Sequence, residues 1–136
     1  MNFTTKLAIA VAEDLEVWRK LNIVAFLMSG IVYETEGIIG ENYKDASGCA
    51  YSPLCIQPVV ILKAGRDKLS MFLKRANTNG VKAALYIEDM FYTGYDEANR
   101  ATVKKYESEA LPVVGIGIRA EKKQVDKIFK GATLHN

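Results

Sequence analysis

Four apolar segments of this chain have the composition of buried β-strands, and a segment with helical periodicity follows each of them. The four segments are KLAIAVA (6–12), IQPVVILKA (56–64), VKAALYIE (81–88) and VVGIGIRA (113–120). Strands that alternate with helices along a chain form a sheet with parallel pairs, covered by helices. The pattern therefore predicts an α/β fold.

The first predicted helix covers residues 17–30, with Gly30 as its C-terminal stop. The stripe expected to face the core consists of Val17, Leu21, Val24 and Met28, widened by Trp18, Ala25 and Phe26. A helix this apolar should be mostly enclosed, so Asn22 is expected to be buried or half-buried with hydrogen-bond partners. Structural pinning and ligand contact are both open explanations for Asn22.

Further helices are predicted around 69–76, 93–106 and 121–131. Between the first helix and the second strand, the sequence DASG (45–48) matches a type I turn, and the flanking ENYK and CAYS are expected to pair as a short hairpin. Pro58 cannot donate to a strand ladder, so it should lie at the start or on the edge of its strand.

The bulk composition indicates a single domain covering residues 1–136. The hydrophobic share is 49% and the charged share 25%, which suffices for a core without disulfides. The formal net charge of +2 gives no support to general nucleic-acid binding. We expect no signal peptide and no membrane span, and therefore a cytoplasmic location.

The motifs of common catalytic and cofactor sites are absent from the sequence. Its one histidine, His135, and its two cysteines, Cys49 and Cys55, lack metal-ligand spacing, so no metal and no cofactor are predicted. No nucleophile elbow and no phosphate loop occur. The glycines of GIG (115–117) lie inside a predicted strand, where they permit close approach of another backbone.

The segment IEDMFYTGYDEANR (87–100) has two interpretations. Thr93 and Asp96 fit a capping box at the start of the third helix, which needs no function to explain it. The capping box does not account for the crowded aromatic side chains of the segment. Because ligands of such sheets collect at the carboxyl ends of strands, beside helix N-termini, the segment is also a candidate site.

Carboxylates are predicted to gather at this edge of the sheet. Asp14 ends the first strand and should lie beside Glu88, Asp89 and Asp96 if the strands run in parallel. Like charges close together raise the pKa of one group, which would provide a general acid or base near neutral pH.

The sequence resembles a bacterial family catalogued as domain of unknown function 2000. The resemblance is carried by DLEVWRKLNIVAFLMSGI (14–31), IIGENYKDASGCAYSPL, VDKIFKG and the pattern E-x-M-F-x-T-G-x-D-x-x-N from Glu88 to Asn99. It implies a fold similar to peptidyl-tRNA hydrolase II: a single-domain, three-layer α/β structure with a mixed, mostly four-stranded sheet flanked by helices.

The hydrolase resemblance also implies candidate catalytic residues. Asp14-Leu15 matches the pair before the first helix of the hydrolase, and Lys20 lies about one residue from its functional lysine. EDMFYTG stands near its Asp-Ala-Gly-x-Thr segment without reproducing it. The resemblance thus implies a shared scaffold with a replaced catalytic set.

The leading hypothesis is a binding protein for a small anionic or nucleotide-like ligand, held at the carboxyl edge of the sheet by Asn22, Glu88, Thr93, Asp96 and Asn99. A second hypothesis is a divergent hydrolase of peptidyl-tRNA or a related ester, and only in this hypothesis is tRNA a partner. Its general acid–base candidates are Asp14, Lys20 and Asp96. A third hypothesis is a homodimer formed through the Tyr-rich segment 31–54.

Overall fold

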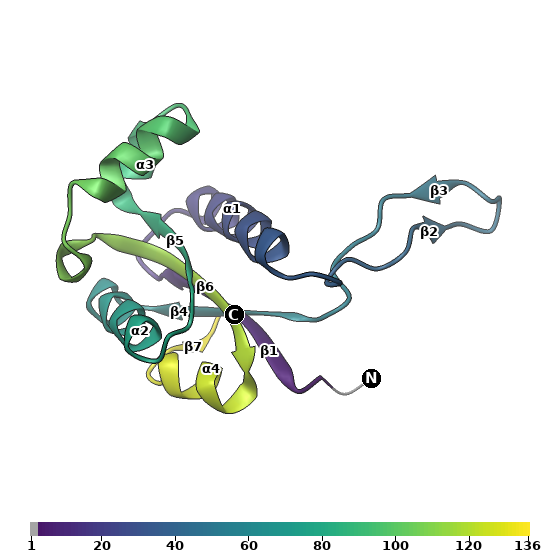
Figure 1. Ribbon diagram of the computed structural model, residues 1–136. Coiled ribbons are helices and arrows are strands. Elements are labelled where there is room, and N and C mark those ends of the chain that lie inside the picture. Colours follow the sequence, from purple (N-terminus) through teal and green to yellow (C-terminus); the bar gives the residue numbers. More distant parts are fainter. Residues whose placement is uncertain (1–2) are drawn as a thin grey trace.

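The computed structural model describes residues 3–136, which form three layers (Figure 1). One helix, α1 (Val17–Glu34), lies on one face of the main sheet, and α2 (Arg66–Thr78) and α4 (Lys122–Ile128) lie on the other. The predicted α/β class is confirmed. The remaining helices are α3 (Asp96–Lys104) and two 3-10 turns, η1 (Glu88–Tyr92) and η2 (Ser108–Ala110).

The main sheet is mixed and has five strands in the order β5-β6-β1-β4-β7. Its members are β1 (Thr5–Ala12), β4 (Val59–Ala64), β5 (Ala84–Ile87), β6 (Val113–Glu121) and β7 (Thr133–Leu134). β1 pairs in parallel with β4, whereas β6 is antiparallel to both β1 and β5. β1, β4 and β5 therefore run in one direction, and their carboxyl ends share one edge of the sheet.

The prediction of a mostly four-stranded sheet missed β7. This strand has only two residues, which pair with Leu62 and Lys63 of β4. Two residues are too short for an alternating pattern to be recognised in the sequence. Pro58 directly precedes β4, as predicted.

Two glycines of the interior strand β6 determine how α1 packs on the sheet. A Cβ atom on Gly115 would collide with Ile23 of α1, and one on Gly117 would lie 2.9 Å from Ile31. The glycines thus open a groove that accepts the buried side chains of α1, which are Ile23, Leu27 and Ile31. Close packing of this kind is intolerant of added volume.

This packing contradicts part of the predicted orientation of α1. Val24 and Met28 of the predicted stripe are half-buried against the core, whereas Val17 and Leu21 do not face it, because the glycine groove takes the face that contains Ile23. Val17 and Leu21 are 70% and 65% exposed. Gly30 does not stop the helix, which continues to Glu34. A Cβ atom at Gly30 would make only an ordinary contact of 3.6 Å with Ala84 of β5.

The opposite face of the sheet is closed by α2 and α4. Phe72 of α2 and Phe129 after α4 meet edge to face, with ring centroids 5.3 Å apart. Gly80 ends α2 in the left-handed region, with φ at 67°, as the NTNG sequence predicts. The four long strands and these helices share one hydrophobic core.

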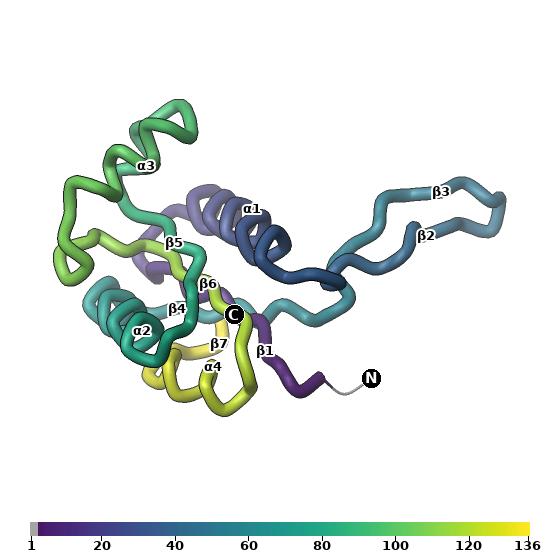
Figure 2. The backbone as a smooth tube through the Cα atoms, viewed as in Figure 1, coloured from purple at the N-terminus to yellow at the C-terminus, as the bar shows by residue number. Residues whose placement is uncertain are grey.

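The predicted hairpin is present and forms an arm. β2 (Tyr43–Lys44) and β3 (Ala50–Tyr51) pair in antiparallel fashion beyond the end of α1, and the arm projects away from the main sheet (Figures 1 and 2). The carboxylate of Asp45 accepts hydrogen bonds from the Ser47 and Cys49 amides and the Tyr51 hydroxyl. The hydrogen bond from Tyr51 is the largest cause that lowers the pKa of Asp45, and the hydrogen bonds from backbone N–H groups lower it further.

The predicted capping box at Thr93 is wrong. α3 begins at Asp96, its N-cap residue is Tyr95, and no side-chain cap bond is made. Asp96 instead forms an ion pair with Arg100, one turn further along α3. The Thr93 hydroxyl is engaged by Asn99, so the residues that resembled a cap are used elsewhere.

Replacing Gly115 tests the groove beneath α1. Gly115→Ala should lower the free energy of unfolding by about 1–3 kcal/mol, because the new methyl group overlaps Ile23. Gly94→Ala is the matched control: Gly94 has open space around it and no positive φ, so its effect should stay within about 0.5 kcal/mol. Urea denaturation measures both variants, and equal effects would contradict this account of the packing.

Candidate functional site

An ion-pair cluster joins the carboxyl ends of β1, β4 and β5. Arg66 is the first residue of α2 and follows β4 directly after Gly65. Its guanidinium nitrogens lie 3.1 Å from a carboxylate oxygen of Asp14 and 3.0 Å from one of Glu88. Partial burial acts to lower the pKa of Arg66, but the hydrogen bond to Asp14 and the charge of Glu88 outweigh it and raise that pKa. Asp14 and Glu88 do meet at one edge, as predicted, but an arginine neutralises them.

Beside this cluster, a pocket of about 400 Å³ lies between α1 and the segment from η1 to α3. We call it the α1–α3 pocket. Its volume falls within the range typical of small-molecule sites. It is lined by Trp18, Asn22, Phe26, Tyr86, Met90, Phe91, Thr93, Gly94, Tyr95, Asp96 and Asn99.

The wall of the α1–α3 pocket is a chain of aromatic rings. The ring centroids of Phe26 and Tyr86 are 5.9 Å apart, those of Tyr86 and Phe91 5.2 Å, and those of Phe91 and Trp18 6.4 Å. The guanidinium of Arg19 lies 4.5 Å from the Phe91 centroid, on a cation–π contact. Contacts between neighbouring rings hold the wall in place before any ligand arrives.

Two polar residues at one end of the pocket orient each other. The Thr93 hydroxyl donates to the side-chain oxygen of Asn99 and lies 3.2 Å from the Met90 carbonyl oxygen. Because the Asn99 oxygen accepts this bond, its NH₂ group remains a donor beside the pocket.

Two further polar groups of the pocket have no protein partner. Within residues 3–136, neither the amide of half-buried Asn22 nor the hydroxyl of Tyr86 makes a side-chain hydrogen bond. The predicted pinning of Asn22 by a loop or strand is therefore wrong. Burial raises the pKa of Tyr86, against the opposing effect of Arg19, so its hydroxyl stays protonated and can donate. Neither group is among the fully buried polar atoms without a partner, so solvent reaches both, and a polar ligand that replaces this water could hydrogen-bond to them.

The predicted ligand residues divide into two groups. Asn22, Thr93, Asp96 and Asn99 line the same pocket, which the sequence analysis expected them to share. Glu88 does not line it, because Arg66 and Arg19 hold its carboxylate. The site therefore lies on the α1 side of the sheet edge.

The predicted acid–base candidates are not brought together. Asp14 is paired with Arg66, Asp96 with Arg100, and the Lys20 amine lies 3.2 Å from Nε2 of His135, beyond β7. Asp89, expected in the same group of carboxylates, accepts a hydrogen bond from the Tyr106 hydroxyl. Each charged group has its own partner, so no general acid–base pair is assembled.

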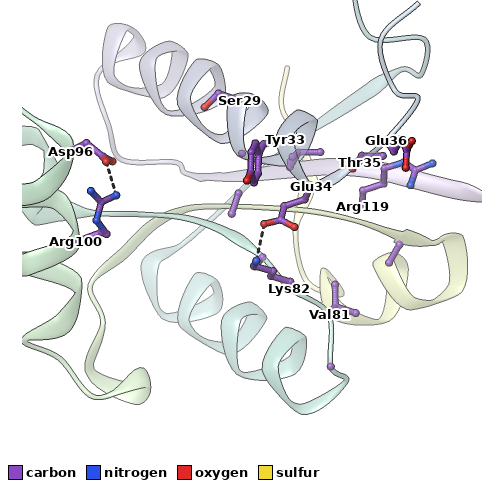
Figure 3. Close-up of a pocket in the computed structure, with 16 residues that line it drawn as sticks. Ser29, Tyr33, Glu34, Thr35, Glu36, Val81, Lys82, Asp96, Arg100 and Arg119 are labelled. Carbon is purple, nitrogen blue, oxygen red and sulfur yellow. Dashed lines mark hydrogen bonds and ion pairs between the residues drawn. The ribbon is translucent and has the colours of Figure 1, made fainter.

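A larger depression of about 1150 Å³ adjoins the α1–α3 pocket on the far side of Asp96, which lines both. Figure 3 shows Arg100 and Asp96 on α3 on one side of it, with Ser29 and Tyr33 of α1 nearby. Lys82 forms an ion pair with Glu34 across the depression, and Arg119 lies at its other end.

Among residues 3–136, no three His, Cys, Asp or Glu side chains gather as a metal ion would require. None of the helices in that range combines the length and hydropathy needed to cross a bilayer.

Sequence reasoning missed Tyr86, and it misplaced Trp18 and Phe26. Tyr86 lies in an apolar strand, where nothing distinguishes a pocket residue from a core residue. Trp18 and Phe26 were assigned to the core of the first helix. Their neighbour Asn22 was the available signal, since it is the one amide side chain within an apolar helix.

The fold and the pocket define a mixed α/β domain whose candidate site lies between the first helix and the turn after β5. The chain belongs to a family described as "Protein of unknown function (DUF2000)", whose model matches residues 5–136. A solved structure of a protein of unknown function, Atu0240 from Agrobacterium tumefaciens strain C58, is similar. It is 47% identical, covers 99% of this chain and 100% of its own, and has a TM-score of 0.97.

No match is found among the curated proteins. Neither the family description nor that of the solved structure names an activity. The resemblance to peptidyl-tRNA hydrolase II therefore stays a prediction.

Removing Arg66 tests the ion-pair cluster. At low ionic strength, Arg66→Met should lower the free energy of unfolding by up to about 1 kcal/mol, because two carboxylates lose their shared partner at a partly exposed site. About 1 M salt should remove most of the difference by screening. Lys74→Met, at an exposed position of the same helix, should show no such salt dependence. If salt leaves the loss of unfolding free energy unchanged, the loss comes from packing and not from charge.

Proposed function

We propose that this protein is a binding module for a small nucleotide-like ligand whose planar ring occupies the α1–α3 pocket. The observation that carries the proposal is the half-buried amide of Asn22, which has no partner within residues 3–136 and lies in an aromatic pocket. An amide offers both a donor and an acceptor, which matches the hydrogen-bonding edge of a nucleobase.

The aromatic wall supports a planar ligand. Stacking of a base on an aromatic side chain contributes about 1–3 kcal/mol per base and tolerates different bases. Trp18, Phe26 and Tyr95 line the pocket and are all exposed, so their rings are accessible to a ligand. The Tyr86 hydroxyl and the Asn99 NH₂ group add donors at fixed positions.

The charges favour a nucleotide-like ligand over a simple anion. The described residues that line the pocket include one carboxylate, Asp96, and no lysine or arginine. An anionic group would have no partner inside the pocket. It would instead extend past Asp96 to Arg100, whose side chain is 69% exposed in the adjoining depression.

Thermal unfolding in the presence of nucleosides, nucleotides and inorganic phosphate, each at millimolar concentration, tests the proposal. A ligand at ten times its Kd stabilises the folded state by about 1.4 kcal/mol. For a domain of this size, that raises the Tm by about 5 °C. We expect such a rise with at least one nucleoside or nucleotide and none with phosphate alone.

A matched pair of variants assigns the rise to the pocket. The Asn22→Ala variant should lose the ligand-induced rise in Tm, whereas the Asn77→Ala variant, changed at an exposed position of α2, should keep it. The proposal fails if no nucleoside or nucleotide raises the Tm, or if Asn22→Ala responds as the wild type does.

A further inference from the structure

α1 has the sequence of an enclosed helix but is only partly covered. From Leu21 to Tyr33 it carries no charged residue. A helix that is apolar all around is normally buried on all sides. Here Ile23, Leu27 and Ile31 alone are buried, while Leu21 and Tyr33 are among its exposed apolar side chains.

One face of α1, exposed at Val17 and Leu21 and half-buried against the core at Val24 and Met28, has the spacing of a helix–helix contact. Val17, Leu21, Val24 and Met28 follow one another at intervals of four, three and four residues, and we call them the outer seam. This spacing is that of helices that pack side by side at a shallow angle. The outer seam is separate from the α1–α3 pocket, whose α1 residues are Trp18, Asn22 and Phe26.

The sheet beside the outer seam is also incompletely covered. α1 packs on β1, β5 and β6. A Cβ atom on Gly117 would meet both Ile31 of α1 and Ile9, so Ile9 points to the face of the sheet that α1 covers. Ile61 of β4 is the partner of Ile9 and therefore points to the same face. Ile61 is half-buried, as is its neighbour on that side, Val59.

The arm leaves the molecule next to this region, because it connects α1 to β4 (Figure 2). Hydrogen bonds around Asp45 give it a defined shape, yet it projects away from its own domain. It carries several exposed apolar side chains: Ile39, Tyr43, Tyr51, Leu54 and Ile56. β2 and β3 pair only with each other among the described strands, which leaves their outer edges open.

We propose that a second copy of this chain covers the outer seam, and that each arm lies across the other copy. A two-fold pair presents the same surface twice, so one arrangement buries both outer seams and both arms. A stable pair needs about 800 Å² from each copy. The apolar side chains available for such a contact are 41–70% exposed: Val17 and Leu21 on the seam, and Ile39, Tyr43, Tyr51, Leu54 and Ile56 on the arm.

Charge favours an arm that reaches a second copy. Residues 36–56 contain three acids, Glu36, Glu41 and Asp45, and one base, Lys44. The whole chain carries a net charge of +2, so the remainder of the chain is positive. Residues 36–56 thus carry a net charge of −2 and the remainder +4, so the arm of one copy and the body of another differ in sign.

Sedimentation velocity on the full chain tests the proposal. The wild type should sediment as a dimer at tens of micromolar. Leu21→Glu places a charge in the outer seam at a 65% exposed position, and it should weaken the dimer at least 100-fold while the circular dichroism stays unchanged. Val17→Lys, in the first turn and 70% exposed, gives a second variant that cannot disturb the core. Met71→Glu, exposed on α2 across the sheet, is the matched control and should remain dimeric.

A second variant tests the arm. In this variant a two-residue turn replaces residues 42–52, and the hydrogen bond from the Gly40 N–H to the Leu54 carbonyl is kept. It should also be monomeric. The proposal is overturned by a wild type that is monomeric at tens of micromolar, whether or not it binds lipid vesicles. It is also overturned if the arm-shortened variant stays dimeric, or if Leu21→Glu and Val17→Lys variants dimerise like the wild type.

Discussion

The contact between α1 and the two glycines of β6 determines the rest of the structure. Gly115 and Gly117 leave a groove that only the Ile23 face of the helix fills. Once that face is engaged, the helix cannot rotate without leaving a cavity or a clash. Its other residues are then fixed in place: Asn22 lies beside the turn after β5, and Leu21 lies away from the sheet.

Much of the fold follows from the sequence because local patterns determine it. The four long strands, the DASG turn and the end of α2 each depend on a few neighbouring residues. The rotation of α1 does not, because two apolar stripes of similar strength compete in the same helix. The choice between them is made by glycines almost one hundred residues away, whose effect only the packed structure reveals. The same limit applies to β7, which is too short to show a pattern.

The candidate site was predictable in place but not in composition. Parallel strands bring their carboxyl ends to one edge, so Asp14 and Glu88 were expected to meet there. The sequence could not indicate that Arg66, which follows β4, would neutralise both Asp14 and Glu88. Nor could it indicate that Tyr86 turns toward a pocket. Asn22 and Thr93 do line one pocket, as expected.

The sides of α1 have different surroundings: one side packs on the sheet, one lines the α1–α3 pocket, and one is the surface that we propose a second copy covers. Trp18, the single tryptophan of the chain, lines the α1–α3 pocket and therefore reports on ligand binding there. Titration of its fluorescence with nucleosides and nucleotides is the most direct measurement. The account predicts a saturable change that Asn22→Ala weakens. Fluorescence that stays constant to millimolar concentrations of every nucleoside and nucleotide would contradict it.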